Sequence, residues 1–152
     1  MDPILSFQGE HRFLSNFFPA RVPLDSVWYP TVEHAYQAAK TTVPEERELV
    51  RLCRSPGQAK RMGRALTIRE DWENRRVVIM RLLLWEKFQI PHLRAALLAT
   101  GDARLEEGNL WGDTFWGVHN GRGRNVLGEL LMEIRLAIVA EGRSARGEAG
   151  PD

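Results

Sequence analysis

The 152-residue sequence is poor in several features that mark large functional classes. It has a single cysteine, Cys53, so no internal disulfide can form, and its apolar neighbours Leu49, Val50 and Leu52 favour a buried structural thiol. A chain without disulfides is expected to work in a reducing cytoplasm. No run approaches the ~18 apolar residues of a membrane span. The first residues also lack the basic and then apolar pattern of a signal peptide.

Neither the net charge nor the distribution of possible metal ligands indicates a functional class. The 21 basic and 20 acidic side chains nearly cancel, which gives no general reason to expect nucleic-acid binding. Arginine outnumbers lysine by 18 to 3, which suits phosphate recognition, although genome composition explains it more simply. The four histidines are scattered and Cys53 is alone, so we expect no metal and no cofactor. A serine-hydrolase nucleophile elbow is missing as well.

The length and composition predict one soluble domain, with 43% hydrophobic and 27% charged residues. We expect a mainly α-helical domain over residues 1–140 with a minor N-terminal β-hairpin. The hairpin is expected over residues 21–28, turning at Leu24, Asp25 and Ser26, after short extended pieces near the N-terminus. Residues 141–152 are rich in Gly, Arg, Ser and Ala and are expected to form a disordered tail.

Capping signals and helical spacing place the expected helices. They are 31–40 with Thr31 as cap, a helix from Pro44 through Cys53, a short one from Ser55 to Gly63, 72–88 with Asp71 as cap, 91–99, and 125–140 with Asn125 as cap. Between the last two lies a stretch rich in Gly, Asn and aromatic residues, which we expect to be a long loop. Long ordered loops often carry function.

The first expected helix has an unusual face. Glu33, Tyr36, Gln37 and Lys40 stand at i, i+3, i+4 and i+7, so an acid, a phenol, an amide and an amine share one side. Periodicity alone favours a solvated amphipathic helix with a weak Glu–Lys pair. The aromatic lead-in at 27–30 favours instead a helix whose start is enclosed.

The expected loop offers two further candidates. Residues 110–118 hold two tryptophans, one phenylalanine and Asp113, which could clamp a planar base through stacking worth ~1–3 kcal/mol. The same tryptophans could equally fill the core under a long loop, and the residues leave both interpretations open. Residues 120–125 could bind an anion through backbone N–H groups, although a plain loop and helix cap is the simpler interpretation.

Several strings taken together resemble the YbiA/NADAR family. They are F-L-S-N-F at 13–17, W-Y-P-T-V-E-H-A-Y-Q-A-A-K at 28–40, A-K-R-M-G-R at 59–64, Arg69, Trp72, K-F at 87–88, D-T-F-W-G at 113–117 and G-R-N-V-L-G-E-L-L-M at 123–132. They keep the family's order over nearly the whole chain. The chain departs from the family pattern at Thr41-Thr42 and at 118–120, where relatives are richer in glycine, which leaves the substrate's identity open.

The resemblance implies a mainly helical fold and hydrolysis of a bond between ribose and an amine or base nitrogen, without metal or cofactor. Known family substrates include phosphoribosylamino-pyrimidine intermediates of riboflavin synthesis and ADP-ribose attached to guanine. The implied partner is therefore a small ribosylated molecule, with ADP-ribosylated nucleic-acid bases as a second class and no membrane. A nucleotide-binding module without catalysis and a purely structural protein are the alternatives.

The resemblance also implies the site residues. Glu33, Asp113 and Lys40 are the expected catalytic residues, and we expect Glu33 and Asp113 to converge on one ribose-sized pocket. Lys40 is left with two roles, phosphate binding or attack on an opened sugar as a Schiff base. The expected substrate-binding residues are Asn16, Phe17, His34, Tyr36, Gln37, Arg64, Trp72, Trp116, Gly117 and Asn125.

Overall fold

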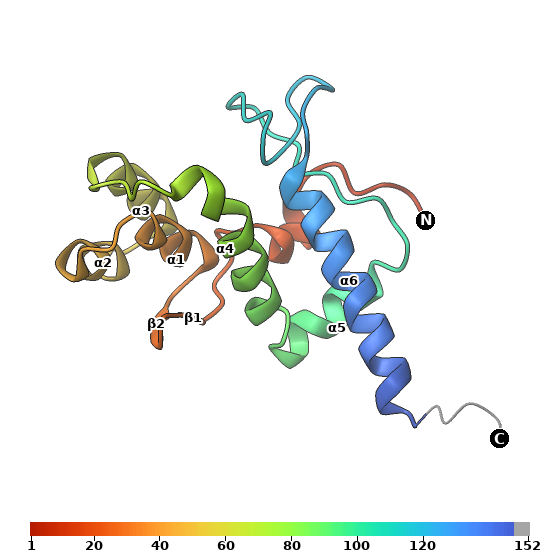
Figure 1. The fold of residues 1–152 in the computed structure, drawn as a ribbon. Coiled ribbons are helices and arrows are strands. Elements are labelled where there is room, and N and C mark those ends of the chain that lie inside the picture. The colour runs from red at the N-terminus through yellow and green to blue at the C-terminus, as the bar shows by residue number, and fades with distance from the viewer. Residues whose placement is uncertain (148–152) are drawn as a thin grey trace. The chain divides into compact units, whose positions relative to one another are not determined.

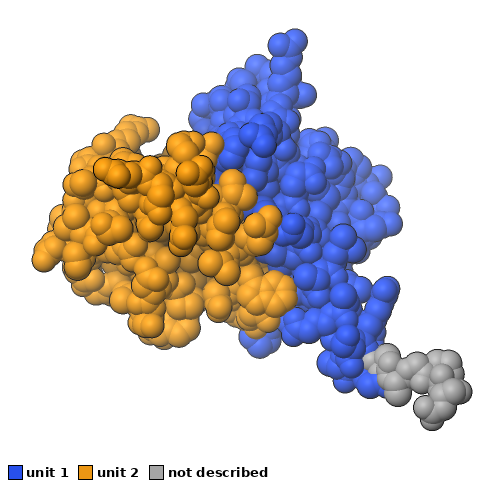
Figure 2. All heavy atoms as spheres, in the orientation of Figure 1, with its two compact units in different colours: residues 1–15, 91–152 blue, residues 16–90 orange. Residues whose placement is uncertain are grey.

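The structure, a computed structural model, describes residues 1–147. Over this range the chain is mainly helical with a single two-stranded sheet, which confirms the predicted fold class (Figure 1). It divides into two compact units, each described by itself below (Figure 2). Unit 2 is Asn16–Ile90, and unit 1 comprises Met1–Ser15 and the chain from Pro91 onward. A single domain over 1–140 stays a prediction. Across the described residues, no helix combines the length and apolar character that crossing a bilayer requires.

Unit 2 is built around one short helix. Helix α1 (Val32–Ala39) is contacted by all the other main elements of this unit. These are α2 (Pro44–Arg51), α3 (Pro56–Met62), α4 (Trp72–Lys87) and the strands β1 (Val22–Leu24) and β2 (Val27–Tyr29). A short 3-10 helix, η2 (Gly63–Ala65), continues α3. All 8 residues of α1 are buried, polar ones included, so α1 is not a solvated amphipathic helix.

Local sequence explains why these elements form. Thr31 caps α1 by accepting the His34 N–H at 3.1 Å, and Ser55 caps α3 in the same way. The hairpin pairs β1 with β2 antiparallel through a two-residue turn, as predicted. Asp25 and Ser26 hold φ values of 48° and 66°, the left-handed conformations that tight hairpin turns require.

Unit 1 contains η1 (Gly9–Leu14), α5 (Pro91–Ala99) and α6 (Val126–Ala145), with the predicted long loop between the last two. The extended N-terminal pieces were a wrong prediction in part, because residues 9–14 form a 3-10 helix that begins at Gly9 with φ 58°. Helix α6 continues past the expected end into the segment expected to be a tail, where Arg94 pairs with Glu141 at 3.9 Å. Residues 148–152 of that expected tail lie outside the described residues.

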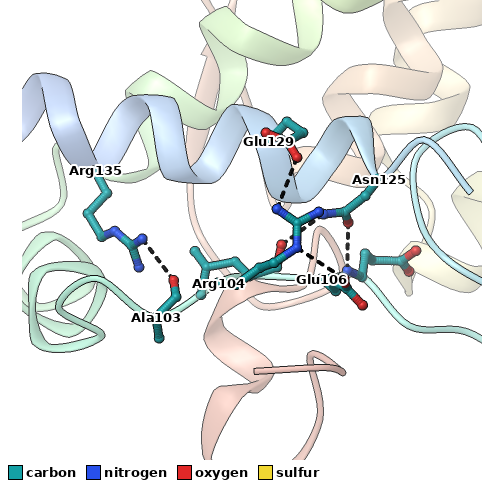
Figure 3. Close-up of polar contacts among 8 residues, drawn as sticks. Ala103, Arg104, Glu106, Asn125, Glu129 and Arg135 are labelled. Carbon is teal, nitrogen blue, oxygen red and sulfur yellow. Dashed lines mark hydrogen bonds and ion pairs between the residues drawn. The ribbon is translucent and has the colours of Figure 1, made fainter. Parts of the chain in front are cut away.

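Two predicted cap residues stand at the predicted positions but do not cap with their side chains. Asp71 and Asn125 make no capping bond from their side chains in the described chain. Asp71 instead accepts from Arg69 Nε at 2.6 Å. Asn125 takes a left-handed conformation with φ 53°, and its amide binds two loop residues. Its Oδ1 accepts from the Glu107 N–H at 3.0 Å, and its Nδ2 donates to the Leu105 carbonyl at 2.9 Å (Figure 3).

Arginines fasten the loop after α5 to helix α6. The buried Arg135 guanidinium donates to the Ala103 carbonyl at 2.8 Å. Arg104 lies between Glu106 at 3.1 Å and Glu129 of α6 at 3.3 Å (Figure 3). These charge-assisted bonds fix the start of the long loop against the helix that follows it.

Candidate active site

Glu33 is a buried carboxylate held from two sides. It lies in the first turn of α1 with 7% of its surface exposed. Its backbone N–H donates to the Asn16 carbonyl at 3.1 Å, and Gln37 Nε2 donates to its Oε1 at 2.8 Å. The positive end of a helix favours a negative charge at this position. The structure thus brings together three residues that were predicted for the site.

Gln37 has a fixed amide orientation because an ionised carboxylate can only accept hydrogen bonds. Its Nε2 must face Glu33, and its Oε1 is then buried without a hydrogen-bond partner among the described residues. Gly63 packs against this oxygen so closely that a Cβ there would lie 1.9 Å from it. An unpaired buried acceptor costs about 1–3 kcal/mol. The chain therefore holds Gln37 toward Glu33 at the expense of stability.

Asn16 repeats this pattern. Its Nδ2 makes only a weak contact with Met80 Sδ at 3.6 Å, and its Oδ1 is buried without a partner in the described chain. Asn16 and Gln37 hold the only buried, unpaired side-chain polar atoms in residues 1–147, and both residues bind Glu33, Gln37 through its side chain and Asn16 through its backbone carbonyl. Such atoms are uncommon in native structures and call for a functional explanation.

Aromatic rings line the same helix. Tyr36 of α1 and Trp72 of α4 are both buried, with ring centroids 5.1 Å apart and planes tilted by 55°. Lys40 Nζ lies 5.9 Å from the Tyr36 ring. The three predicted residues therefore form one group at the side and C-terminal end of α1.

Lys40 is half-buried, and burial is the main cause that lowers the pKa of its amine. The negative charge of Glu33 opposes this shift, whereas the positive charges of Lys60 and Arg64 add to it. The C-terminal end of α1 thus gathers cations, with a carboxylate two turns away. Lys60 was not among the predicted site residues.

His34 has both ring nitrogens engaged. Nδ1 lies 2.8 Å from Thr31 Oγ1, and Nε2 lies 3.0 Å from the Cys53 carbonyl. The ring therefore ties α1 to the segment after α2, and direct contact with substrate stays a prediction. Cys53 itself is buried, as predicted, and burial raises the pKa of its thiol. Phe17, in contrast, is 41% exposed.

Lys87 is a buried lysine that sequence reasoning missed. Its side chain has 0% exposure, with Nζ 5.2 Å from the Phe88 ring and 5.8 Å from the Phe18 ring. Burial lowers the pKa of its amine to about 7. The signal was present in the sequence, because Lys87 follows Met80 and Leu83 by seven and four positions and so shares their apolar face.

Asp113, in unit 1, organises its own loop. Its Oδ1 accepts the N–H groups of Phe115 at 3.0 Å and Trp116 at 2.9 Å. The buried Asn109 amide brackets the same residue, accepting from the Asp113 N–H at 3.0 Å and donating to its carbonyl at 2.9 Å. Both side-chain bonds use Oδ1, so Oδ2 is the oxygen suited to a ligand. The catalytic role of Asp113 stays a prediction.

The aromatic loop has a tight interior and an exposed rim. The rings of Phe115 and Trp116 meet edge to face with centroids 4.9 Å apart. Gly117 is required beneath them, because a Cβ there would lie 2.2 Å from the Glu107 carbonyl oxygen. Trp111 is 59% exposed and Trp116 is partly exposed, so neither tryptophan is a fully buried core residue. Base stacking by Trp116 stays a prediction.

The start of α6 has its first backbone donors occupied by the preceding loop. The N–H groups of Asn125, Val126 and Leu127 donate to the carbonyls of residues 117, 115 and 116 at 3.3, 3.1 and 3.0 Å. The loop itself therefore occupies the donors at the start of α6, which favours the loop-and-cap interpretation there, and anion binding by residues 120–125 stays a prediction. Within the described chain, no group of three or more His, Cys, Asp or Glu side chains is placed to hold a metal ion.

The predicted site residues fall into two sets. Unit 2 holds Asn16, Phe17, Glu33, His34, Tyr36, Gln37, Lys40, Arg64 and Trp72, and unit 1 holds Asp113, Trp116, Gly117 and Asn125. Within unit 2 the structure clusters the polar face of α1 around a buried carboxylate. The convergence of Glu33 with Asp113 stays a prediction.

A buried carboxylate held by an amide, with a lysine two turns further along the same helix, is typical of an enzyme active site. The model of the NADAR domain matches residues 6–139, and this chain belongs to the NADAR domain family. The family resemblance inferred from the motifs is confirmed.

Curated relatives agree in sequence. The chain is 40% identical over 147 residues to N-glycosidase YbiA of Shigella boydii, covering 92% of this chain and 91% of that protein. It is 40% identical over 139 residues to a riboflavin biosynthesis protein of Vibrio vulnificus, covering 88% of this chain and 38% of that protein. The NMR structure of Escherichia coli YbiA is similar with a TM-score of 0.81 and 38% identity, covering 92% of this chain and 85% of that one.

Proposed function

We propose that this chain hydrolyses the N-glycosidic bond between a ribose and an amine or base nitrogen, with a phosphoribosyl pyrimidine of riboflavin synthesis as the first substrate to test. That the chain is an N-glycosidase in general follows from its family and from relatives that bear this name. The relatives named as riboflavin biosynthesis proteins support the choice of substrate. ADP-ribosylated guanine is the second substrate class.

The buried carboxylate of Glu33 is the observation that carries the proposal. Cleavage of an N-glycosidic bond passes through a sugar with oxocarbenium character, which a nearby negative charge stabilises. A carboxylate away from water interacts more strongly with such a cation than an exposed one does. Gln37 and Asn16 hold Glu33 in place before substrate arrives. Glu33 would either stabilise the cation directly or activate the attacking water.

The remaining residues have supporting roles in the proposal. Tyr36 and Trp72 give the site an aromatic wall that suits the apolar face of a sugar or base. Asp113 binds sugar hydroxyls or acts as the acid for the departing nitrogen, and Trp116 stacks on the base. These last two roles rest on the family resemblance.

The test replaces Glu33 by glutamine and measures release of the base or amine from both substrate classes by mass spectrometry. Glu33→Gln should lower kcat by about 100-fold or more, because the negative charge is lost while the shape is kept. Glu73→Gln is the matched control, since Glu73 is an exposed glutamate in the first turn of α4 of the same unit. It should leave kcat within about twofold, as surface changes usually do.

Two outcomes would count against the proposal. Full turnover by Glu33→Gln would remove Glu33 from the reaction. Binding of ribosylated compounds by the unmodified protein without any product would favour a nucleotide-binding module instead of an enzyme.

A further inference from the structure

The hydrogen bonds of His34 assign the position of its ring proton. Nε2 lies 3.0 Å from the Cys53 carbonyl oxygen, which can only accept a hydrogen bond, so Nε2 must carry the proton. In the neutral ring Nδ1 is then an acceptor, and the Thr31 hydroxyl, 2.8 Å away, is its donor. The same hydroxyl oxygen accepts the His34 backbone N–H at 3.1 Å. Thr31 therefore gives its proton and one lone pair to the same histidine.

These bonds direct both ring nitrogens of His34 into the protein. A histidine that binds a substrate or transfers a proton needs a ring nitrogen that reaches the reacting molecule. The rings and hydroxyls concerned are buried, and the two ring partners are a backbone oxygen and the side chain that caps α1. His34 is thus placed to act on the helix that carries it.

The first turn of α1 is anchored in more than one direction. The Asn16 carbonyl accepts the Glu33 N–H at 3.1 Å, and the His34 ring reaches Cys53, the second residue after α2. Successive residues of an α-helix point about 100° apart, so the His34 ring and the Glu33 carboxylate leave α1 in different directions. Anchors in different directions oppose rotation of the helix about its axis. Such a rotation would move the Glu33 carboxylate.

We infer that His34 is a positioning residue, a neutral ring protonated on Nε2 that locks the first turn of α1 against Cys53 and so fixes the Glu33 carboxylate. The inference rests on the proposed function, in which Glu33 acts on the sugar. It replaces the contact with substrate that the family resemblance implies for His34. An imidazole suits this task because one rigid ring serves both partners, whereas a glutamine or asparagine amide takes the place of one ring nitrogen.

The first experiment locates the ring proton in the unmodified protein. Nitrogen-15 NMR of protein labelled at histidine distinguishes the two neutral tautomers and the imidazolium, and loss of a signal in His34→Gln identifies the His34 ring. At neutral pH the ring should carry its proton on Nε2 alone. A proton on Nδ1, in a tautomer mixture or in an imidazolium, would refute the assignment. The measurement requires no substrate and no activity.

The second experiment measures kinetics on a phosphoribosyl substrate. His34→Leu removes both ring bonds and should lower kcat about tenfold with KM within about twofold, because a misplaced carboxylate stabilises the transition state less. His34→Gln keeps a donor for the Cys53 carbonyl and should bring kcat back to within about threefold of the unmodified protein. His92→Leu is the matched control, since His92 is an exposed histidine near the start of α5. It should change neither constant by more than about twofold.

Three kinetic results would overturn the inference, with circular dichroism melting to show that each variant is folded. A raised KM with unchanged kcat would place His34 against the substrate. Unchanged kcat in His34→Leu, together with a lower melting temperature, would leave the ring a purely structural role. A folded His34→Gln as inactive as Glu33→Gln would make the ring a participant in the reaction.

Failure to fold and failure of the proposed function are both distinguishable from these results. If His34→Leu does not fold, His34→Gln and the NMR measurement still decide. If the ring proton lies on Nε2 but the unmodified protein cleaves no ribosylated substrate, the anchoring of α1 by His34 stands and the glycosidase does not.

Discussion

Helix α1 of unit 2 and the aromatic loop of unit 1 use polar side chains in opposite ways. In α1 the backbone is held by helical bonds, and the amide of Gln37 serves another side chain while its oxygen stays unpaired. In the loop, the Asn109 amide and the Oδ1 of Asp113 form hydrogen bonds with backbone N–H and carbonyl groups. Regular structure leaves side chains for chemistry, whereas an irregular segment needs them to keep its shape.

The largest effect is expected at Gly117, in the aromatic loop. Gly117→Ala puts a Cβ 2.2 Å from a backbone carbonyl and 1.8 Å from the Glu107 carboxylate, so the loop must shift. We expect a loss of about 3 kcal/mol in the free energy of unfolding. Urea unfolding measures it. Gly112→Ser is the control, because Gly112 also lies in this loop with open space around it, although its φ of 85° adds some strain. Equal losses in the two variants would show that crowding at Gly117 is not the cause.

Gly63→Ala should act on α1 in a different way. The added Cβ meets the flexible end of Gln37, which can swing aside and release Glu33. We expect kcat to fall about tenfold while the free energy of unfolding changes by about 1 kcal/mol. Steady-state kinetics and urea unfolding separate the two effects. An inactive variant that is also destabilised as strongly as Gly117→Ala would argue that position 63 supports the fold alone.

Two variants of Asp113 separate its role in holding the loop from any role of its charge in catalysis. Asp113→Asn keeps an acceptor for the N–H groups of Phe115 and Trp116, whereas Asp113→Ala removes it. We expect Asp113→Ala to cost about 1–2 kcal/mol in unfolding free energy and Asp113→Asn less than about 0.5 kcal/mol. Kinetics on the stable Asp113→Asn variant then measure what the charge contributes to catalysis. Equal stability of the two variants would contradict the loop-holding role.

Lys87 adds a pH dependence to the comparison. Its pKa is about 7 in the folded protein and near 10.5 in the unfolded chain, so between these values only the unfolded chain holds the proton. Stability should therefore rise with pH from about 7 to 10, and Lys87→Met should lack this rise. At pH 7 the variant should be more stable by about 1 kcal/mol. Urea unfolding at pH 7 and 9 tests this, and parallel pH profiles would contradict it.

The main features of α1 could be predicted from sequence. Thr31, the shared face of Glu33 and Gln37, and the small alanines opposite all have local signatures. The burial of the polar face could not be predicted, because it depends on α2, α3 and α4 surrounding the helix. The fit of Gly63 against Gln37 joins residues far apart in sequence, and no local pattern encodes it.

Unit 1 shows why the remaining details escaped. Asn125 stands where a cap is expected, yet its amide binds Leu105 and the Glu107 N–H, partners that only the folded loop brings near. Helix α6 outlasts its apolar pattern, and the ion pair of Glu141 with Arg94 is a tertiary contact. Lys87 is the instructive exception, because its position on an apolar face was readable from spacing.

Because the side-chain oxygens of Asn16 and Gln37 are buried without a hydrogen-bond partner in the described chain, replacing these amides should raise stability and lower catalytic activity. Evolution in a hot environment, without demand for the reaction, should first replace these two amides by apolar residues of similar size. A homologue that keeps the fold but has lost both amides should therefore be more stable and less active than this enzyme.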